Sequence, residues 1–176
     1  MTDQIPHGAF LAELDAHRKI LFKVAHLYCA NEADRQDLMQ DILIQLWRSF
    51  GRFDGRSKFS TWMYRVALNV AISWRRGQRR GLQGAVPLTD AALKDRVIDE
   101  RSEETPLEVR LLLGELLERL GEFDRALILL YLEGHDHDSI GDVLGISNTN
   151  VATRIGRIKQ RLRREVAAPL TNGDRR

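Results

Sequence analysis

Apolar residues recur at intervals of three or four through most of this chain, the spacing that gathers side chains on one face of an α-helix. The intervals are most regular in two segments, 37–50 and 60–76. The first carries apolar side chains at Leu38, Ile42, Leu46 and Phe50, and the second carries them at Trp62, Val66, Val70 and Trp74. Weaker stripes predict helices at residues 10–30, 107–120, 124–133, 138–144 and 148–166. No segment has the alternation of a half-buried strand, so the pattern predicts an all-α fold.

Polar residues and glycines lie where these helices are expected to begin and end. The polar break at 31–34 can cap the helix that follows it. Ser60 and Ser147 are placed as N-caps, since a serine hydroxyl accepts a hydrogen bond from a free backbone N–H group of the first turn. Gly134 and Gly145 come directly after predicted helices, where a residue in the left-handed conformation commonly ends a helix.

The pattern divides the chain into two small helical domains. Residues 81–106 lack a sustained apolar stripe and carry glycines, prolines and an acidic run, a composition that favours a flexible linker. We therefore expect a first domain at residues 1–80 and a second at residues 107–170, with a frayed tail after it. Hydrophobic residues make up 43% of the chain, which is enough for packed cores.

Charge is strongly segregated along the chain, although the formal net charge is only +2. Residues 1–80 hold 13 Lys/Arg against 8 Asp/Glu, residues 81–123 hold 5 against 10, and residues 124–176 hold 9 against 7. Two stretches, 56–80 and 153–164, contain arginines and lysines and no acidic residue. Two basic patches on either side of an acidic connector indicate two contacts with one polyanion.

Composition argues against a secreted protein, a membrane protein and an enzyme. The chain has no apolar run long enough to span a bilayer and no signal-peptide pattern, so we expect a cytoplasmic protein without membrane insertion. The single cysteine, Cys29, excludes a disulfide within the chain and is expected to pack as a small hydrophobic residue. The segment 135–138 (His-Asp-His-Asp) has no cysteine nearby and favours a structural or solvated role. No phosphate-binding glycine loop or nucleophile motif occurs, so we expect no catalytic residue, metal or cofactor.

Residues 139–151 (SIGDVLGISNTNV) have the pattern of a helix-turn-helix. Gly141 stands where two helices approach closely, which calls for a side chain no larger than a methyl group, and Gly145 can take the left-handed conformation of the turn. The residues that such a unit buries are apolar, namely Ile140, Leu144, Ile146 and Val151. The second helix would enter the major groove of DNA with its first turns at the base edges. A plain helical hairpin with a solvated basic face fits the same segment and stays open as an alternative.

Three further segments carry a resemblance to a known family. The first contains Asp37-Leu-Met-Gln-Asp41, and the second contains Phe59-Ser-Thr-Trp-Met-Tyr-Arg-Val-Ala-Leu-Asn69. They resemble the DL-x-Q-[DE] and F-x-TW-[LM]-YR-x-A-x-N helices in the sigma-two domain of bacterial RNA polymerase sigma factors of the extracytoplasmic-function group. The third, Val151-Ala-Thr-Arg-Ile-Gly-Arg157, resembles the V-x-[ST]-R-[IL]-x-R run of their sigma-four domain. The two resemblances occur in the family's order and cover about 120 of the 176 residues.

The resemblance implies a sigma factor that binds core RNA polymerase, directs it to specific promoters and assists promoter melting. Its implied partners are promoter DNA, the β′ clamp and β flap of core polymerase, and an anti-sigma factor. Asp37, Gln40 and Asp41 share one helix face, and the matching family positions dock on the clamp helices of β′. Without the resemblance, this face would be interpreted as solvated.

The resemblance also implies DNA contacts in both domains. In the family, the loop matching 53–59 holds a base flipped from the non-template strand, and the position of Asn69 frames its pocket. The expected contacts with the minus-ten element are Arg56, Lys58, Arg65, Asn69, Arg75 and Arg76. The expected contacts with the minus-thirty-five element are Asn148, Thr149, Asn150, Thr153, Arg154, Arg157 and Lys159. Arginine prefers guanine in the major groove and asparagine prefers adenine, whereas lysine and threonine can bind phosphates.

Some residues depart from the family pattern, and two other functions remain as alternatives. Leu120-Gly121 stands where Leu-Pro is frequent, Ser139-Ile-Gly141 stands where Glu-Ile-Ala is frequent, and Ala152 replaces a frequent basic residue. These changes affect the promoter sequence that would be read. One alternative is a stand-alone helix-turn-helix regulator whose first half is a sensor or dimerisation domain, and another is a protein-interaction module without DNA dependence. The basic stretch 56–80 argues against both, because neither needs it.

Overall fold

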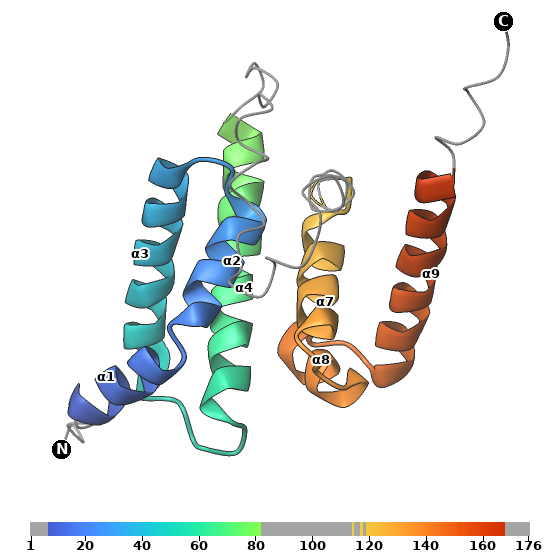
Figure 1. Ribbon diagram of the computed structural model, residues 1–176. Coiled ribbons are helices and arrows are strands. Elements are labelled where there is room, and N and C mark those ends of the chain that lie inside the picture. The colour runs from blue at the N-terminus through green and yellow to red at the C-terminus, as the bar shows by residue number, and fades with distance from the viewer. Residues whose placement is uncertain (1–6, 82–113, 115–116, 118, 168–176) are drawn as a thin grey trace, which may run out of the picture. The chain divides into compact units, whose positions relative to one another are not determined.

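The computed structural model describes residues 7–81, 114, 117 and 119–167, which form helices and turns with no strand among them (Figure 1). The all-α prediction is confirmed. The chain divides into two compact units, Met1–Glu115 and Leu116–Arg176. The predicted linker at 81–106 and the predicted helix at 107–120 lie almost wholly outside the described residues, so the exact domain boundaries stay predictions. None of the described helices is both long and apolar enough to cross a membrane.

The first unit contains α1 (His7–Ala16), α2 (Lys19–Tyr28), α3 (Glu32–Phe50) and α4 (Phe59–Gly81). Helices α2, α3 and α4 pack against one another around an apolar core. The fully buried residues of this core include Val24, Tyr28 and Cys29, then Leu38, Ile42 and Leu46, and then Met63, Ala67 and Ala71. The stripe predicted for α3 is therefore its core face, and the packed state expected for Cys29 is confirmed.

The corner between α2 and α3 is closed by polar groups at the helix ends. Asn31 is the N-cap of α3, as expected, because its side-chain oxygen accepts a hydrogen bond of 2.8 Å from the backbone N–H of Asp34. Arg35 is only 2% exposed, and its guanidinium donates to the carbonyl oxygen of Ala30 at 2.9 Å. The same group lies 3.4 Å from a Glu32 carboxylate oxygen. This buried cation is therefore hydrogen-bonded and paired, as a charge removed from water must be.

The single helix predicted over residues 10–30 is wrong, because the chain forms α1 and α2 with a turn at His17 and Arg18. At this turn the backbone hydrogen bonds shorten from four residues to three: the N–H of Ile20 donates to the carbonyl of His17, and that of Leu21 donates to Arg18. The turn lets α1 leave the direction of α2. Phe10 of α1 then packs on Trp47 and Phe50 at the far end of α3, with ring centroids 5.3 and 4.8 Å away.

The start and the buried face of α4 also differ from the prediction. The helix begins at Phe59, so Ser60 lies inside the first turn and is not the N-cap. The residues buried deepest are Met63, Ala67 and Ala71, one position along from the predicted row of Trp62, Val66, Val70 and Trp74, whose members are only half-buried. Because α4 packs against both α2 and α3, it buries a wide arc, and the small alanines at its centre let the helices approach closely.

The second unit contains α7 (Glu122–Leu132), α8 (His137–Leu144) and α9 (Asn148–Ala167). Gly134 ends α7 with φ +81°, and its N–H donates to the carbonyl of Tyr131 while that of His135 donates to Leu130, the Schellman arrangement. Ser147 caps α9, since its hydroxyl oxygen accepts from the N–H of Asn150 at 3.3 Å. These helix ends confirm the predictions for Gly134 and Ser147.

The turn between α8 and α9 confirms the predicted helix-turn-helix. Gly145 has φ +69°, in the left-handed region that favours glycine. A Cβ atom placed on Gly141 would lie 2.6 Å from the carbonyl oxygen of Ile146. The space at Gly141 is thus tighter than expected, because even a methyl group does not fit without a shift of the backbone.

Candidate nucleic-acid interface and docking face

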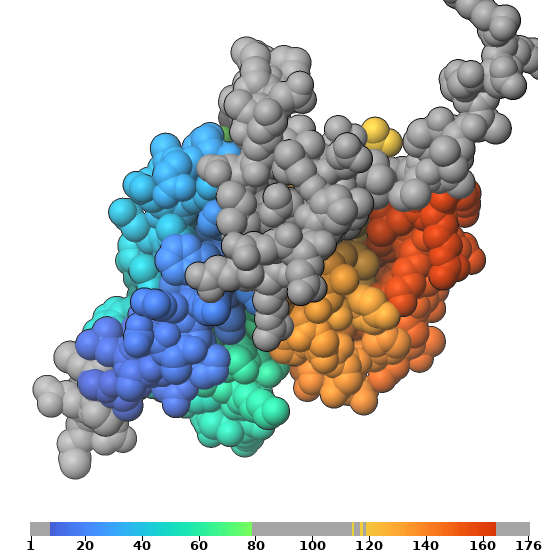
Figure 2. All heavy atoms as spheres, viewed as in Figure 1, coloured from blue at the N-terminus to red at the C-terminus, as the bar shows by residue number. Residues whose placement is uncertain are grey.

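The predicted recognition helix α9 has a buried side and an open side. Val151, Ile155 and Ile158 are buried against α7 and α8, and at 100° per residue they share one face. The opposite face consists of exposed residues, of which four were predicted to contact DNA: Thr149, Asn150, Thr153 and Arg157. Figure 2 shows the atoms of α9 (red) along one edge of this unit. The open side is therefore polar and basic, as a helix that enters the major groove requires.

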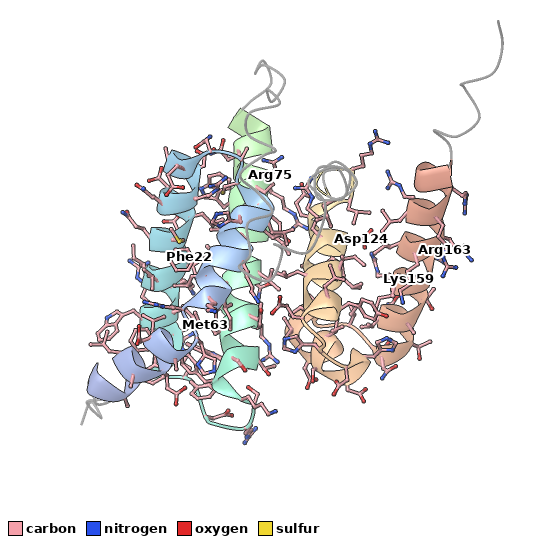
Figure 3. All side chains as sticks on the ribbon, viewed as in Figure 1. Phe22, Met63, Arg75, Asp124, Lys159 and Arg163 are labelled. Atoms are coloured by element: carbon pink, nitrogen blue, oxygen red, sulfur yellow. The ribbon has the colours of Figure 1, made fainter. Side chains whose placement is uncertain are left out.

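Two predicted DNA contacts, Arg154 and Lys159, also contact α7 within the unit. A guanidinium nitrogen of Arg154 lies 3.0 Å from a carboxylate oxygen of Asp124, and its charge lies 5.0 Å from the centre of the Phe123 ring. The ammonium of Lys159 donates to the Tyr131 hydroxyl at 2.6 Å and stands over that ring. Figure 3 labels Lys159 on α9 and Asp124 on α7. These contacts flank the buried face of α9 on both sides, so both residues orient the helix within its unit.

Asn148 and Thr153 each use one polar group within the fold. The Asn148 amide donates to the carboxylate of Asp138 at 2.7 Å, which ties the start of α9 to the start of α8. The Thr153 hydroxyl donates to the backbone carbonyl of Thr149 at 2.8 Å. Both side chains are exposed and keep an oxygen that can accept a further hydrogen bond.

The open face of α9 includes three exposed residues that sequence reasoning did not assign to the site, namely Gly156, Gln160 and Arg164. Gln160 lies seven residues after Thr153, and Arg164 lies seven after Arg157, so each repeats a predicted position two turns further along the helix. The helical period alone could have identified them. They extend the polar face of α9 beyond the predicted set.

In the first unit, the loop between α3 and α4 is held by aromatic side chains. Phe50, Phe53, Phe59 and Trp62 form one cluster, with neighbouring ring centroids 5.2 to 6.3 Å apart. Outside this cluster, the backbone N–H and the guanidinium of Arg56 contact the Asp54 carboxylate at 3.1 and 3.2 Å, and Gly55 turns the chain with φ +72°. Arg56 and Lys58, two predicted DNA contacts, are exposed on this loop.

The predicted DNA contacts on α4 divide into two groups. Arg65, Asn69 and Arg76 are exposed and lie within about 40° of one another around the helix, so they form one polar row. Arg75 lies on the arc of the core residues, is half-buried, and has its Nε atom buried without a hydrogen-bond partner in the described structure. The row of three residues therefore fits a DNA-facing surface better than Arg75 does.

The predicted docking residues of α3, Asp37, Gln40 and Asp41, are all exposed on one face. Ile44 lies between them in projection around the helix and is 49% exposed, although it is large and apolar. Trp47, which is also 49% exposed, lies beside Gln40 in the same projection. An acidic face with two open apolar side chains is suited to a basic protein surface that also offers an apolar contact. Ile44 was not predicted, because an isolated exposed isoleucine has no signal in the sequence pattern.

The segment 135–138 begins α8 and contains its N-cap. The Asp136 carboxylate accepts a hydrogen bond of 2.7 Å from the backbone N–H of Ser139. Hydrogen bonds from the backbone and hydroxyl of Ser139 lower the pKa of Asp136 below its ordinary value. This local capping role agrees with the structural interpretation of the segment.

Both units match family models of bacterial transcription factors. Residues 14–81 match Sigma-70 region 2, and residues 110–162 match Sigma-70, region 4. The RNA polymerase sigma factor CnrH of Cupriavidus metallidurans is 30% identical over 153 residues, 83% of this chain and 80% of that protein. The RNA polymerase sigma-H factor of Pseudomonas aeruginosa is 32% identical over 154 residues, 82% of this chain and 78% of that protein.

The fold is also found in a solved structure. The sigma factor RpoE of Bartonella quintana, solved in complex with the anti-sigma factor NepR, has a TM-score of 0.65 and 19% identity, with 92% of this chain and 96% of that one covered. The helices, the sequence motifs and the relatives all indicate the same family for both units. The chain therefore belongs to the extracytoplasmic-function group of RNA polymerase sigma factors, transcription initiation factors that direct the polymerase to specific promoters.

Proposed function

We propose that three helix faces of this sigma factor make three different contacts. The acidic face of α3 docks on the β′ clamp, the polar row of α4 with the loop before it contacts the minus-ten element, and the open face of α9 reads the minus-thirty-five element. The observation that carries this division is that both acid-free basic stretches expose part of their charge on open helix faces, one in each unit, while an acidic face is exposed on a third helix. The basic faces suit a polyanion such as DNA, and the acidic face suits a basic protein surface.

The minus-ten contact is proposed to act after strand separation. An exposed amide in a row with two arginines can hydrogen-bond a base edge while the arginines hold the strand backbone. Asn69 offers this amide between Arg65 and Arg76. The aromatic cluster of Phe53, Phe59 and Trp62 stiffens the loop that would hold the flipped base.

We expect Asn69→Ala to reduce promoter opening more than promoter binding. Losing one base contact should cost about 1–3 kcal/mol, or roughly tenfold to a hundredfold in open-complex formation. Permanganate reactivity of unpaired thymines measures opening, and filter binding on duplex promoter measures closed-complex affinity. Ser73→Ala, an exposed change one turn further along α4, is the matched control and should leave both unchanged. Equal opening by Asn69→Ala and the parent protein would remove Asn69 from the site.

For the minus-thirty-five contact, we propose different roles for two arginines of α9. Arg157 reads DNA, and Arg154 orients the helix within its unit. Arg157→Ala should weaken holoenzyme protection of the upstream element by about 1–3 kcal/mol if a bidentate base contact is lost. Arg154→Ala should lower the stability of the second unit by about 0.5–1 kcal/mol and affect protection less, because its ion pair and ring contact are within the unit.

Asp124→Ala provides the matched control for this separation. It removes the carboxylate that Arg154 contacts and leaves the open face of α9 unchanged, so it should reproduce the stability effect of Arg154→Ala. Footprinting at several salt concentrations and thermal unfolding measure the two effects. Full upstream protection by Arg157→Ala would mean that α9 reads the promoter without this residue.

We also propose that an anti-sigma factor regulates this protein. The related fold of RpoE was solved with the anti-sigma factor NepR, which supports an anti-sigma partner for this chain as well. Such a partner would cover the α3 face and the basic surfaces until release.

A sigma factor acts with RNA polymerase, so we place the protein in the cytoplasm. We also propose the β flap of the polymerase as the contact of the second unit. The alternative of a stand-alone regulator leaves the acidic face of α3 and its match to region 2 without a role.

A further inference from the structure

Gly156 lies in the middle of α9, and nothing in the described fold requires a glycine there. Its backbone is not among those with positive φ, and a Cβ atom placed on it would have no neighbour within 4 Å. Gly145 and Gly141 in the same unit differ, because the first needs its left-handed conformation and the second has a carbonyl oxygen where its side chain would be. The glycine at 156 is therefore not explained by folding.

The position is also one where glycine weakens the helix. Glycine is among the least favourable residues in a helix interior, since it loses the most backbone freedom on folding and leaves the backbone open to water. Gly156 lies eight residues after the start of α9 and eleven before its end, so no helix terminus compensates for this effect. A side chain such as alanine would fit the fold and strengthen the helix.

Gly156 lies on the open face of α9 and is itself exposed. Ala152 and Thr153 lie one turn before it, and Lys159 and Gln160 lie one turn after it, so these four residues surround it on the helix surface. Each of these neighbours is exposed. The helix backbone is thus uncovered within the surface proposed to face the promoter.

We propose that Gly156 is a specificity-determining residue, which lets the backbone of α9 approach the base edges closely at this turn. The inference rests on the proposed role of α9 as the reader of the upstream element. A helix with its side chains is about as wide as the major groove, so the side chains on its leading edge set how deeply it can enter. With no side chain at 156, α9 enters further, and Thr153 and Arg157 reach base edges that they would otherwise miss.

This role predicts effects of opposite sign on the helix and on DNA binding. Gly156→Ala and Gly156→Leu should both slow amide hydrogen exchange in α9, because both residues favour the helix. Both should weaken upstream binding by the holoenzyme, with Leu the more severe, by about tenfold or more, because its bulk meets a close-packed interface. The loss should fall on the few base pairs that face this turn, measured with a library of upstream-element variants.

Two controls separate this inference from the proposed function itself. Gly77→Ala and Gly77→Leu make the same changes at an exposed helical glycine of α4, which also has no neighbour within 4 Å. They should slow exchange in α4 and leave upstream selectivity as it is in the parent protein. Arg157→Ala reports independently whether α9 reads the element.

The outcomes are distinct. Slower exchange in α9 together with graded loss of upstream binding from Gly to Ala to Leu supports the inference. Upstream binding by Gly156→Leu equal to that of the parent protein, while Arg157→Ala binds weakly, overturns it and leaves the proposed function standing. If Gly156→Leu and Arg157→Ala both bind the upstream element like the parent protein, the role of α9 as reader is overturned, and this inference with it. Faster exchange in α9 of Gly156→Ala would also overturn it, because a binding defect would then follow from damage to the helix.

Discussion

The double change Asp37→Arg with Asp41→Arg is expected to abolish binding to core RNA polymerase while the protein stays folded. Both carboxylates are exposed on the outer face of α3, opposite the buried Leu38, Ile42 and Leu46, so neither contributes to the core. Reversal places two cations against a partner surface proposed to be basic. Like charges brought together at an interface cost several kcal/mol, so affinity should fall by about a thousandfold or more. Gel filtration with purified core polymerase measures this, with circular dichroism as the test of folding.

The control variant makes the same change of charge on another face of the same unit. Glu13→Arg with Asp15→Arg alters two exposed acids of α1, whose contacts with His17 and Arg18 are at the surface, at 3.6 and 3.9 Å. Surface ion pairs of this kind contribute little to stability. This variant should co-elute with core polymerase like the parent protein. Co-elution of the folded α3 variant as well would contradict docking through Asp37 and Asp41.

The change Gly141→Val is expected to unfold the helix-turn-helix and to leave the first unit intact. A Cβ atom at 141 would lie 2.6 Å from the Ile146 carbonyl oxygen, closer than real Cβ contacts come. That oxygen belongs to the backbone of the turn, and the Gly141 carbonyl itself accepts from the N–H groups of Gly145 and Ile146 at 2.8 and 3.1 Å. The turn cannot move aside without losing these bonds. Overpacking of a fixed site, with the two further methyl groups of valine, should cost about 2–4 kcal/mol.

Alanine at two glycines of the same unit provides the matched comparison. Gly141→Ala should destabilise the second unit, whereas Gly156→Ala adds the same methyl group to open space and should stabilise it. Hydrogen exchange in α8 and α9 measures both, and upstream protection should be lost with Gly141→Val while binding to core polymerase is retained. Equal stability of the two alanine variants would contradict the close approach at Gly141.

Much of the fold could be predicted from local signals in the sequence. Asn31, Ser147 and Gly145 end or begin helices where expected, because capping depends on residues only a few positions apart. The face of α4 could not be predicted in the same way. Its apolar residues cover more than half of the helix circumference, and only the packing of α2 and α3 selects Met63 and Ala67 as the centre of the core.

The candidate site shows the same limit at the level of side chains. A sequence pattern places Arg154 and Arg157 on one helix, yet only the structure reveals that Arg154 contacts Asp124, thirty residues away. Arg35 and Arg125 carry no signal that they are buried, because each is paired through backbone carbonyls of a preceding turn, Ala30 and Leu120. The pairing of Arg154 with Asp124 depends on where the chain folds back, and the burial of Arg35 and Arg125 depends on how their helices pack; local periodicity encodes neither.

Footprinting of one promoter fragment tests the central claim most directly. The fragment is selected from genomic DNA by core polymerase reconstituted with this chain, and protection is then compared for the chain alone, core polymerase alone and both together. The division of roles among α3, α4 and α9 predicts that only the mixture protects both the minus-ten and the minus-thirty-five elements. Protection of the same duplex by the chain without polymerase, or protection by core polymerase that does not depend on the chain, would contradict it.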